Sequence, residues 1–133
     1  MPASELSQLI TKRRMNWFLS HIKGIFEDQD NLKPEEWAYK IILLNHMRIN
    51  PEHSKIVRIS PTKIKIESYN FCPYLEACDR LGLDTRKICK EIGEPSIQRV
   101  CEMVNPNLKF SRNYDNIRPY NPHFCEEYIE LVL

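Results

Sequence analysis

Residues 55–69 of this chain read KIVRISPTKIKIESY, and this stretch decides the fold class. It holds two runs in which polar and β-branched residues alternate, a pattern typical of strands with one buried face. Ser60 and Pro61 separate the runs and favour a turn. We therefore expect a β-hairpin, with Lys63 and Lys65 on its solvent-facing side.

The 50 residues before this hairpin are predicted to be helical. Apolar residues recur at three- and four-residue steps from Ser4 to Phe26, and Ser4 can serve as the N-cap. A second helix is expected to begin at Pro34, where a missing N–H costs nothing. It should end near Asn50, because a residue before a proline is disfavoured in the helical region. Two such helices form a hairpin that needs a partner or a sheet to cover it.

Short helices and two returning strands are predicted after residue 69. Gly82 and Gly93 are placed to end the first two helices, and Asp84 and Glu94 favour the helix starts that follow. The expected helices span about 73–81, 85–92 and 95–104, and the expected strands span 108–112 and 124–133.

These elements predict an α+β fold, in which an N-terminal helical hairpin packs with a small antiparallel sheet and three short helices. A chain of 133 residues suits a single domain. Within it, residues 1–50 form a helical lead-in and residues 51–133 a cysteine-containing α+β core.

Charge and hydropathy narrow the classes of partner that this protein is expected to bind. The net charge of +1 is a poor electrostatic match to a nucleic acid, so no nucleic-acid partner is expected. No apolar run of about 18 residues is present, and the first residues lack the pattern of a secretory signal. We expect a cytoplasmic protein without a membrane partner, whose N-terminal helices are the candidate surface for homo-oligomers.

The chain contains five cysteines, and this odd number argues against a closed set of disulfides. In a reducing compartment, cysteines favour metal binding or catalysis. Cys101 lies in an apolar stripe with helical spacing and is predicted to be core. Cys78 and Cys89 also lie beside apolar helical positions, where packing and ligation both fit.

Cys72 and Cys125 have the neighbours of reactive thiols. Cys72 precedes Pro73 at a predicted helix N-terminus, where free N–H groups and the helix dipole lower a thiol pKa, although an inert N-cap fits equally well. Cys125 follows His123 by two positions, so both side chains would share one face of a strand. Cys72 is therefore the candidate nucleophile and His123 the candidate base.

A polar and aromatic segment at residues 111–120 supplies the candidate substrate-binding residues Arg112, Arg118 and Tyr120. The two arginines could hold a carboxylate through bidentate hydrogen bonds. The structural alternative is that they pair with carboxylates of the chain itself. The expected partners in that case are Glu76, Asp84 and Glu126.

The order of a strand, Cys72-Pro73, a helix, Cys89 and a closing strand with Cys125 resembles the 2-amino-thiazoline-4-carboxylate hydrolase group and the related vinyl-reductase-type ligand-binding domains. The resemblance covers about residues 56–132. It implies an α+β domain with a thiol-lined pocket that binds or senses a small molecule, or hydrolyses a small cyclic carboxylate. The chain departs from those domains before its last cysteine, where Pro119-Tyr120-Asn121-Pro122 replaces a Gly-Asp turn.

Two alternatives stay open. One is a metal or iron–sulfur module for redox sensing or electron transfer, with zinc or an iron–sulfur cluster held by Cys72, Cys78, Cys89 and Cys125. These spacings lack both the C-x2–4-C knuckles of structural zinc sites and a ferredoxin-type cysteine run, so the ligands would come from distant elements. The other is a non-catalytic interaction domain whose cysteines are core.

Overall fold

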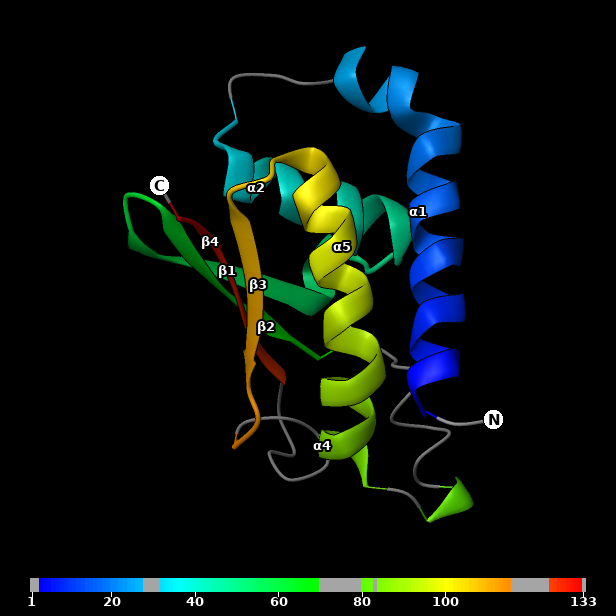
Figure 1. The fold of residues 1–133 in the computed structure, drawn as a ribbon. Coiled ribbons are helices and arrows are strands. Elements are labelled where there is room, and N and C mark those ends of the chain that lie inside the picture. Colours follow the sequence, from blue (N-terminus) through cyan, green and yellow to red (C-terminus); the bar gives the residue numbers. More distant parts are fainter. Residues whose placement is uncertain (1–2, 28–31, 70–79, 83, 116–124, 133) are drawn as a thin grey trace.

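The computed structural model describes residues 3–27, 32–69, 80–82, 84–115 and 125–132, and it confirms the α+β fold (Figure 1). The described strands form one antiparallel sheet in the order β1-β2-β4-β3. Their bounds are β1 (Ser54–Ser60), β2 (Lys63–Ser68), β3 (Leu108–Asn113) and β4 (Cys125–Leu131).

The predicted hairpin is confirmed as β1 and β2. Ile56 pairs with Ile66 and Arg58 with Ile64, and the register shifts between Arg58 and Ser60. Ile64 and Ile66 are buried on the face that the helices cover. On the opposite, outer face, the Lys63 ammonium lies 4.7 Å from the centre of the Tyr128 ring. The alternation in the sequence thus separates the two faces of the sheet.

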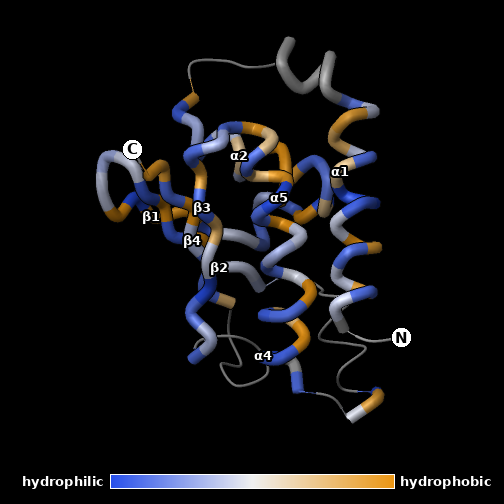
Figure 2. The backbone as a smooth tube through the Cα atoms, in the orientation of Figure 1, coloured by the Kyte–Doolittle hydropathy of each residue, from blue (hydrophilic) through white to orange (hydrophobic). Residues whose placement is uncertain are grey.

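The helices lie on one side of the sheet, in two layers (Figure 1). Helix α5 packs on β3, and α1 packs on the far side of α5. Figure 2 shows hydrophilic and hydrophobic positions alternating along α1, as expected for a helix with one face in solvent. The helical bounds are α1 (Ala3–Glu27), α2 (Pro34–Tyr39), η1 (Lys40–His46), η2 (Pro51–His53), α4 (Thr85–Ile88), η3 (Cys89–Gly93) and α5 (Glu94–Val104).

The core fills the space between the sheet and these helices. Helices α2 and η1 contribute an almost continuous buried run that includes Trp37 and Ile41, and α1 contributes Phe18. Cys101 of α5 is fully buried in this core, so its predicted packing role is confirmed. Among the described residues, none of the helices is both long enough and apolar enough to cross a membrane.

The predicted helix break at Gly93 is wrong. Gly93 has helical dihedrals (φ −66°, ψ −54°), and the chain stays helical from Thr85 to Val104. A Cβ at Gly93 would lie 3.0 Å from Nη1 of Arg112, so the absence of a side chain lets the helix approach this arginine. By contrast, Gly82 does adopt the left-handed conformation expected after a helical turn, with φ +66°.

Other helix boundaries differ by a few residues. Ser4 lies inside α1, which already includes Ala3. The second helix turns into the π-helix η1 and ends at His46, and Arg48 then takes a left-handed φ of 54°. Asn50 instead caps η2, where its Oδ1 accepts a hydrogen bond from the Glu52 N–H at 2.9 Å. Most of the helix predicted at 73–81 lies outside the described residues.

Candidate functional site

The inner face of the sheet changes from apolar to polar along its strands. Phe110 and Ile129 form a buried apolar pair across β3 and β4. Two residues further along β3, Arg112 pairs with Glu127, and Cys125 of β4 pairs with Ser68 of β2. Paired residues share a face, so these four side chains occupy the polar end of the helix-covered face. Together with Cys89 and Tyr114 they are named the inner polar cluster here.

Arg112 is the centre of this cluster, and its side chain is only 8% exposed. Its Nε lies 4.0 Å from Oε1 of Glu127, and its Nη1 donates a hydrogen bond to the Cys89 carbonyl at 3.4 Å. Its guanidinium carbon also lies 5.3 Å from the centre of the Phe110 ring. A guanidinium has five N–H donors, and close carboxylate pairs lie at about 2.7–2.9 Å. The described residues therefore use only a small part of its donor capacity.

The charge of Arg112 is stable in this environment. Burial alone would lower its pKa, but Glu127 and then Cys89, Tyr114 and Cys125 outweigh this effect and raise the pKa above its usual value. Cys89 and Cys125 therefore lie close enough to the guanidinium to interact with its charge. The guanidinium is therefore a permanent cation.

Two hydroxyl groups complete the cluster. Ser68 is 2% exposed, and its buried Oγ lacks a hydrogen-bond partner among the described residues. Burial, followed by the nearby Glu94 carboxylate, raises the pKa of Tyr114, so its phenol stays protonated at neutral pH. A buried hydroxyl without a partner costs free energy that a bound polar group can recover.

Arg112 is the predicted substrate-binding residue that the structure places in a buried site. The structural alternative was that Arg112 and Arg118 pair with carboxylates of the chain itself: the described carboxylate facing Arg112 is Glu127, whereas Glu126 accepts a hydrogen bond from Asn113 at 2.6 Å. The register of β3 and β4 puts the two glutamates on opposite faces. Asp84, another proposed partner, accepts a hydrogen bond from the Arg86 N–H at 3.0 Å, and Glu76 and Arg118 lie outside the described residues.

Five of the predicted site residues lie outside the described residues, so their roles stay predictions: Cys72, Cys78, Arg118, Tyr120 and His123. Of the four proposed metal ligands, the structure describes Cys89 and Cys125. Within the described ranges, no group of three or more His, Cys, Asp or Glu side chains could hold a metal ion. Cys101 is a poor candidate for reaction, because burial and then Glu102 raise its pKa to about 12.

Glu127 and Ser68 were not predicted from the sequence as site residues. The alternation along 125–131 would have put Cys125 and Glu127 on one face, and this was the available signal. Glu127 lies near Arg112, and Cys125 near Ser68, because of the strand order, which the sequence did not predict.

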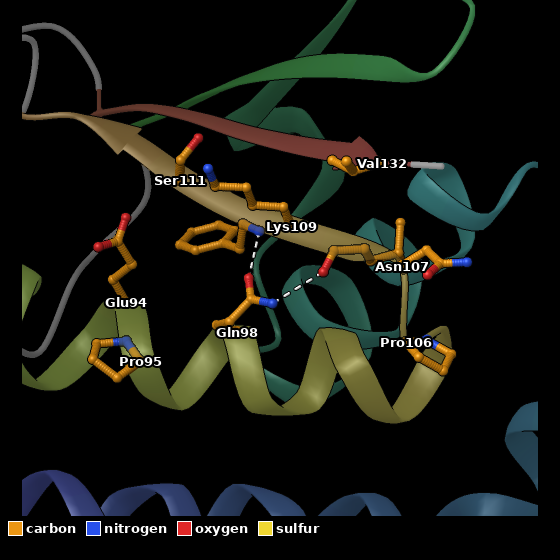
Figure 3. A pocket seen from close by; sticks show the side chains of 10 residues that line it. Glu94, Pro95, Gln98, Pro106, Asn107, Lys109, Ser111 and Val132 are labelled. Carbon is orange, nitrogen blue, oxygen red and sulfur yellow. Dashed lines mark hydrogen bonds between the residues drawn. The ribbon is translucent and has the colours of Figure 1, made fainter.

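A second feature is a groove of about 570 Å³ between α5 and the sheet edge at β3 (Figure 3). Gln98 of α5 spans it: its Nε2 donates to the Leu108 carbonyl at 3.0 Å, and its Oε1 accepts from the Phe110 N–H at 2.6 Å. The side-chain amide therefore bonds to the edge strand as a neighbouring strand would.

Comparisons of this chain with models of protein families, with curated proteins and with solved structures found no match.

Proposed function

We propose that this domain binds a small carboxylate-bearing molecule, with Arg112 holding the carboxylate and Cys89 and Cys125 beside it. The observation that carries this proposal is the buried Arg112 guanidinium, whose only described carboxylate neighbour lies 4.0 Å away. Burying an arginine costs several kcal/mol unless close ion pairs and hydrogen bonds compensate. A ligand carboxylate would supply these through two parallel N–H···O bonds.

The neighbouring charges narrow the ligand class. Arg112 and Glu127 together carry no net charge, so a plain anion would leave the buried cluster with an excess negative charge. A ligand that also carries a cationic amine or amidine group would place this group near Glu127. We therefore favour a small amino-acid-like zwitterion, with its apolar part against Phe110, whose ring already lies beside the guanidinium.

The resemblance to the 2-amino-thiazoline-4-carboxylate hydrolase group agrees with this ligand class. It extends the proposal to hydrolysis of a small cyclic carboxylate, with Cys72 as nucleophile and His123 as base. Both residues lie outside the described part of the chain, and the binding proposal does not depend on them.

Calorimetric titration tests the binding proposal with two probes, 2-amino-thiazoline-4-carboxylate and its carboxamide. We expect the carboxylate to bind and the carboxamide to bind at least about tenfold more weakly, because it cannot form the charged pair with Arg112. Arg112→Lys keeps the positive charge but removes the planar donor fork, so it should weaken carboxylate binding by about tenfold or more.

The matched control is Arg99→Lys. Arg99 lies on α5 with its side chain 54% exposed and pairs with Glu102 at 2.8 Å. This variant should bind the carboxylate with unchanged affinity. Equal affinities for the two probes, or an Arg112→Lys variant that binds like the wild type, would contradict the proposal.

A further inference from the structure

A second buried arginine lies where α1 meets η1. Arg14 is 9% exposed, and its buried Nε lacks a hydrogen-bond partner among the residues that the structure describes. Unlike Arg112, it forms no ion pair with any carboxylate among the described residues. An unpaired buried guanidinium is destabilising, because burial removes its hydration without replacing it.

Other nitrogen groups surround Arg14. The Trp17 ring stacks on His21, with centroids 4.6 Å apart, and its centroid lies 4.5 Å from that of His46. The buried Nδ1 of His46 has no hydrogen-bond partner within the described part of the chain. His21 Nδ1 lies 2.8 Å from the Trp17 carbonyl oxygen, to which it donates, so its Nε2 accepts hydrogen bonds when the ring is neutral.

The charges of Arg14 and His21 act on His46. Burial, followed by the charges of Arg14 and His21, lowers the pKa of His46 to about 4. In the described structure this region therefore collects basic groups and no carboxylate. A bound anion would neutralise the charge of Arg14. It would also raise the pKa of His46, because it favours the protonated imidazole.

The backbone at this place is also unusual. His46 is the last residue of the π-helix η1, and Arg48 takes a left-handed φ of 54° two residues later. Short π-helical segments often occur at functional sites, and left-handed non-glycine residues persist where the surrounding structure holds them. This geometry brings the His46 ring against Trp17 of α1.

We propose that Arg14 and His46 form a binding site for a phosphate group, carried either by free phosphate or by a small phosphate ester. A phosphate offers enough negative charge to neutralise both Arg14 and a protonated His46, and its oxygens can accept from Arg14 Nε and His46 Nδ1. Binding takes up one proton from solvent at His46. This site shares no residue with the inner polar cluster, so it stands or falls separately from the proposed function.

Urea unfolding in phosphate and in chloride of equal ionic strength tests the proposal. Phosphate at about ten times its Kd should raise the urea midpoint of the wild type by roughly 0.5 M. Arg14→Gln should lose this shift, and without phosphate it should be at least as stable as the wild type, because the unpaired charge is gone. Arg13→Gln, which changes the exposed neighbouring arginine, is the matched control and should keep the shift.

A second measurement covers the case in which Arg14→Gln does not fold. In NMR titrations of the wild type and of Arg13→Gln, phosphate should raise the pKa of His46 by at least one unit and leave that of His53 unchanged. Glycerol 3-phosphate, used in parallel, distinguishes an ester ligand from free phosphate. The proposal is overturned if neither probe changes the midpoint or the His46 signals, or if both shift the midpoint of Arg14→Gln as much as that of the wild type.

Discussion

Arg112 and Glu127 are the residues on which the account of the inner polar cluster depends. Both side chains are at most 9% exposed, so each one removed alone leaves a buried charge. Arg112→Met should lower the free energy of unfolding by about 3–5 kcal/mol, because the buried Glu127 carboxylate then loses the arginine that faces it. The double variant Arg112→Met/Glu127→Leu should recover most of this loss. Urea unfolding of the wild type, both single variants and the double variant measures the coupling.

The exposed pair of Arg99 and Glu102 provides the control for this cycle. Arg99→Gln should change the free energy of unfolding by no more than about 0.5–1 kcal/mol. Additive losses in the Arg112 and Glu127 variants would show that the two residues do not compensate each other.

At the residue level, patterns along the chain predict burial better than they predict partners. The apolar stripe around Cys101 correctly predicted a core residue. The dense polar segment led to Arg112, but not to Glu127, which lies 15 positions further along the chain. Glu127 meets Arg112, and Ser68 meets Cys125, only through strand pairing, a tertiary property without a local signal.

At the level of the elements, two hydrogen bonds from Gln98 connect helix α5 to the edge strand β3. Gln98→Leu removes both hydrogen bonds to the edge strand and exposes Phe110 N–H and Leu108 C=O to the groove. We expect a loss of about 1–3 kcal/mol in unfolding free energy and concentration-dependent association, because an unpaired edge can pair with another chain. Light scattering with size-exclusion chromatography and urea unfolding measure the two effects.

Gln98→Glu is the matched variant for this prediction. It keeps an acceptor for the Phe110 N–H and loses the donor to the Leu108 carbonyl, and its added charge opposes association. It should therefore lose some stability and keep the oligomeric state of the wild type. A Gln98→Leu variant that is as stable and as monomeric as the wild type would show that the amide does not protect the edge.

The sequence predicted most elements because their signals are local. Alternation located β1, β2, β3 and β4 to within about two residues, and Pro34 marked the start of α2. The predicted helix break at Gly93 was wrong, because this glycine does not form a turn. Its missing side chain allows Arg112 Nη1 to approach the helix. The order β1-β2-β4-β3 could not be predicted, because strand order depends on packing between distant segments.

For the whole molecule, the lowered pKa of His46 predicts how the free energy of unfolding depends on pH. Its folded-state pKa of about 4 lies below the ordinary value of 6.5. Between these values the unfolded chain binds a proton that the folded chain does not, so stability falls as the pH drops from about 6.5 to 4. Because His46 is only half-buried, we expect this loss in the free energy of unfolding to be about 1–2 kcal/mol.

A comparison of wild type with His46→Gln isolates this contribution, because carboxylates titrate in both proteins. Urea unfolding at pH 7.0 and pH 4.5 should show a larger loss for the wild type than for the variant. Equal losses in the two proteins would mean that His46 is protonated as easily in the folded chain as in the unfolded chain.

The α+β fold, with helices packed on an antiparallel sheet, was predictable from the order and period of the elements. The candidate site was less predictable, because it joins β2, β3, β4 and η3 at the polar end of the inner face. The proposal for this site is that the Arg112 guanidinium binds a carboxylate.

The most direct test observes this guanidinium. In protein labelled with 15N-arginine, the Nε–H signal of Arg112 is assigned through Arg112→Lys and followed during titration with 2-amino-thiazoline-4-carboxylate. We predict that this signal shifts and saturates with the carboxylate, while the carboxamide leaves it in place and the Arg99 signal does not move. An Arg112 signal that stays unchanged at saturating carboxylate would contradict the claim.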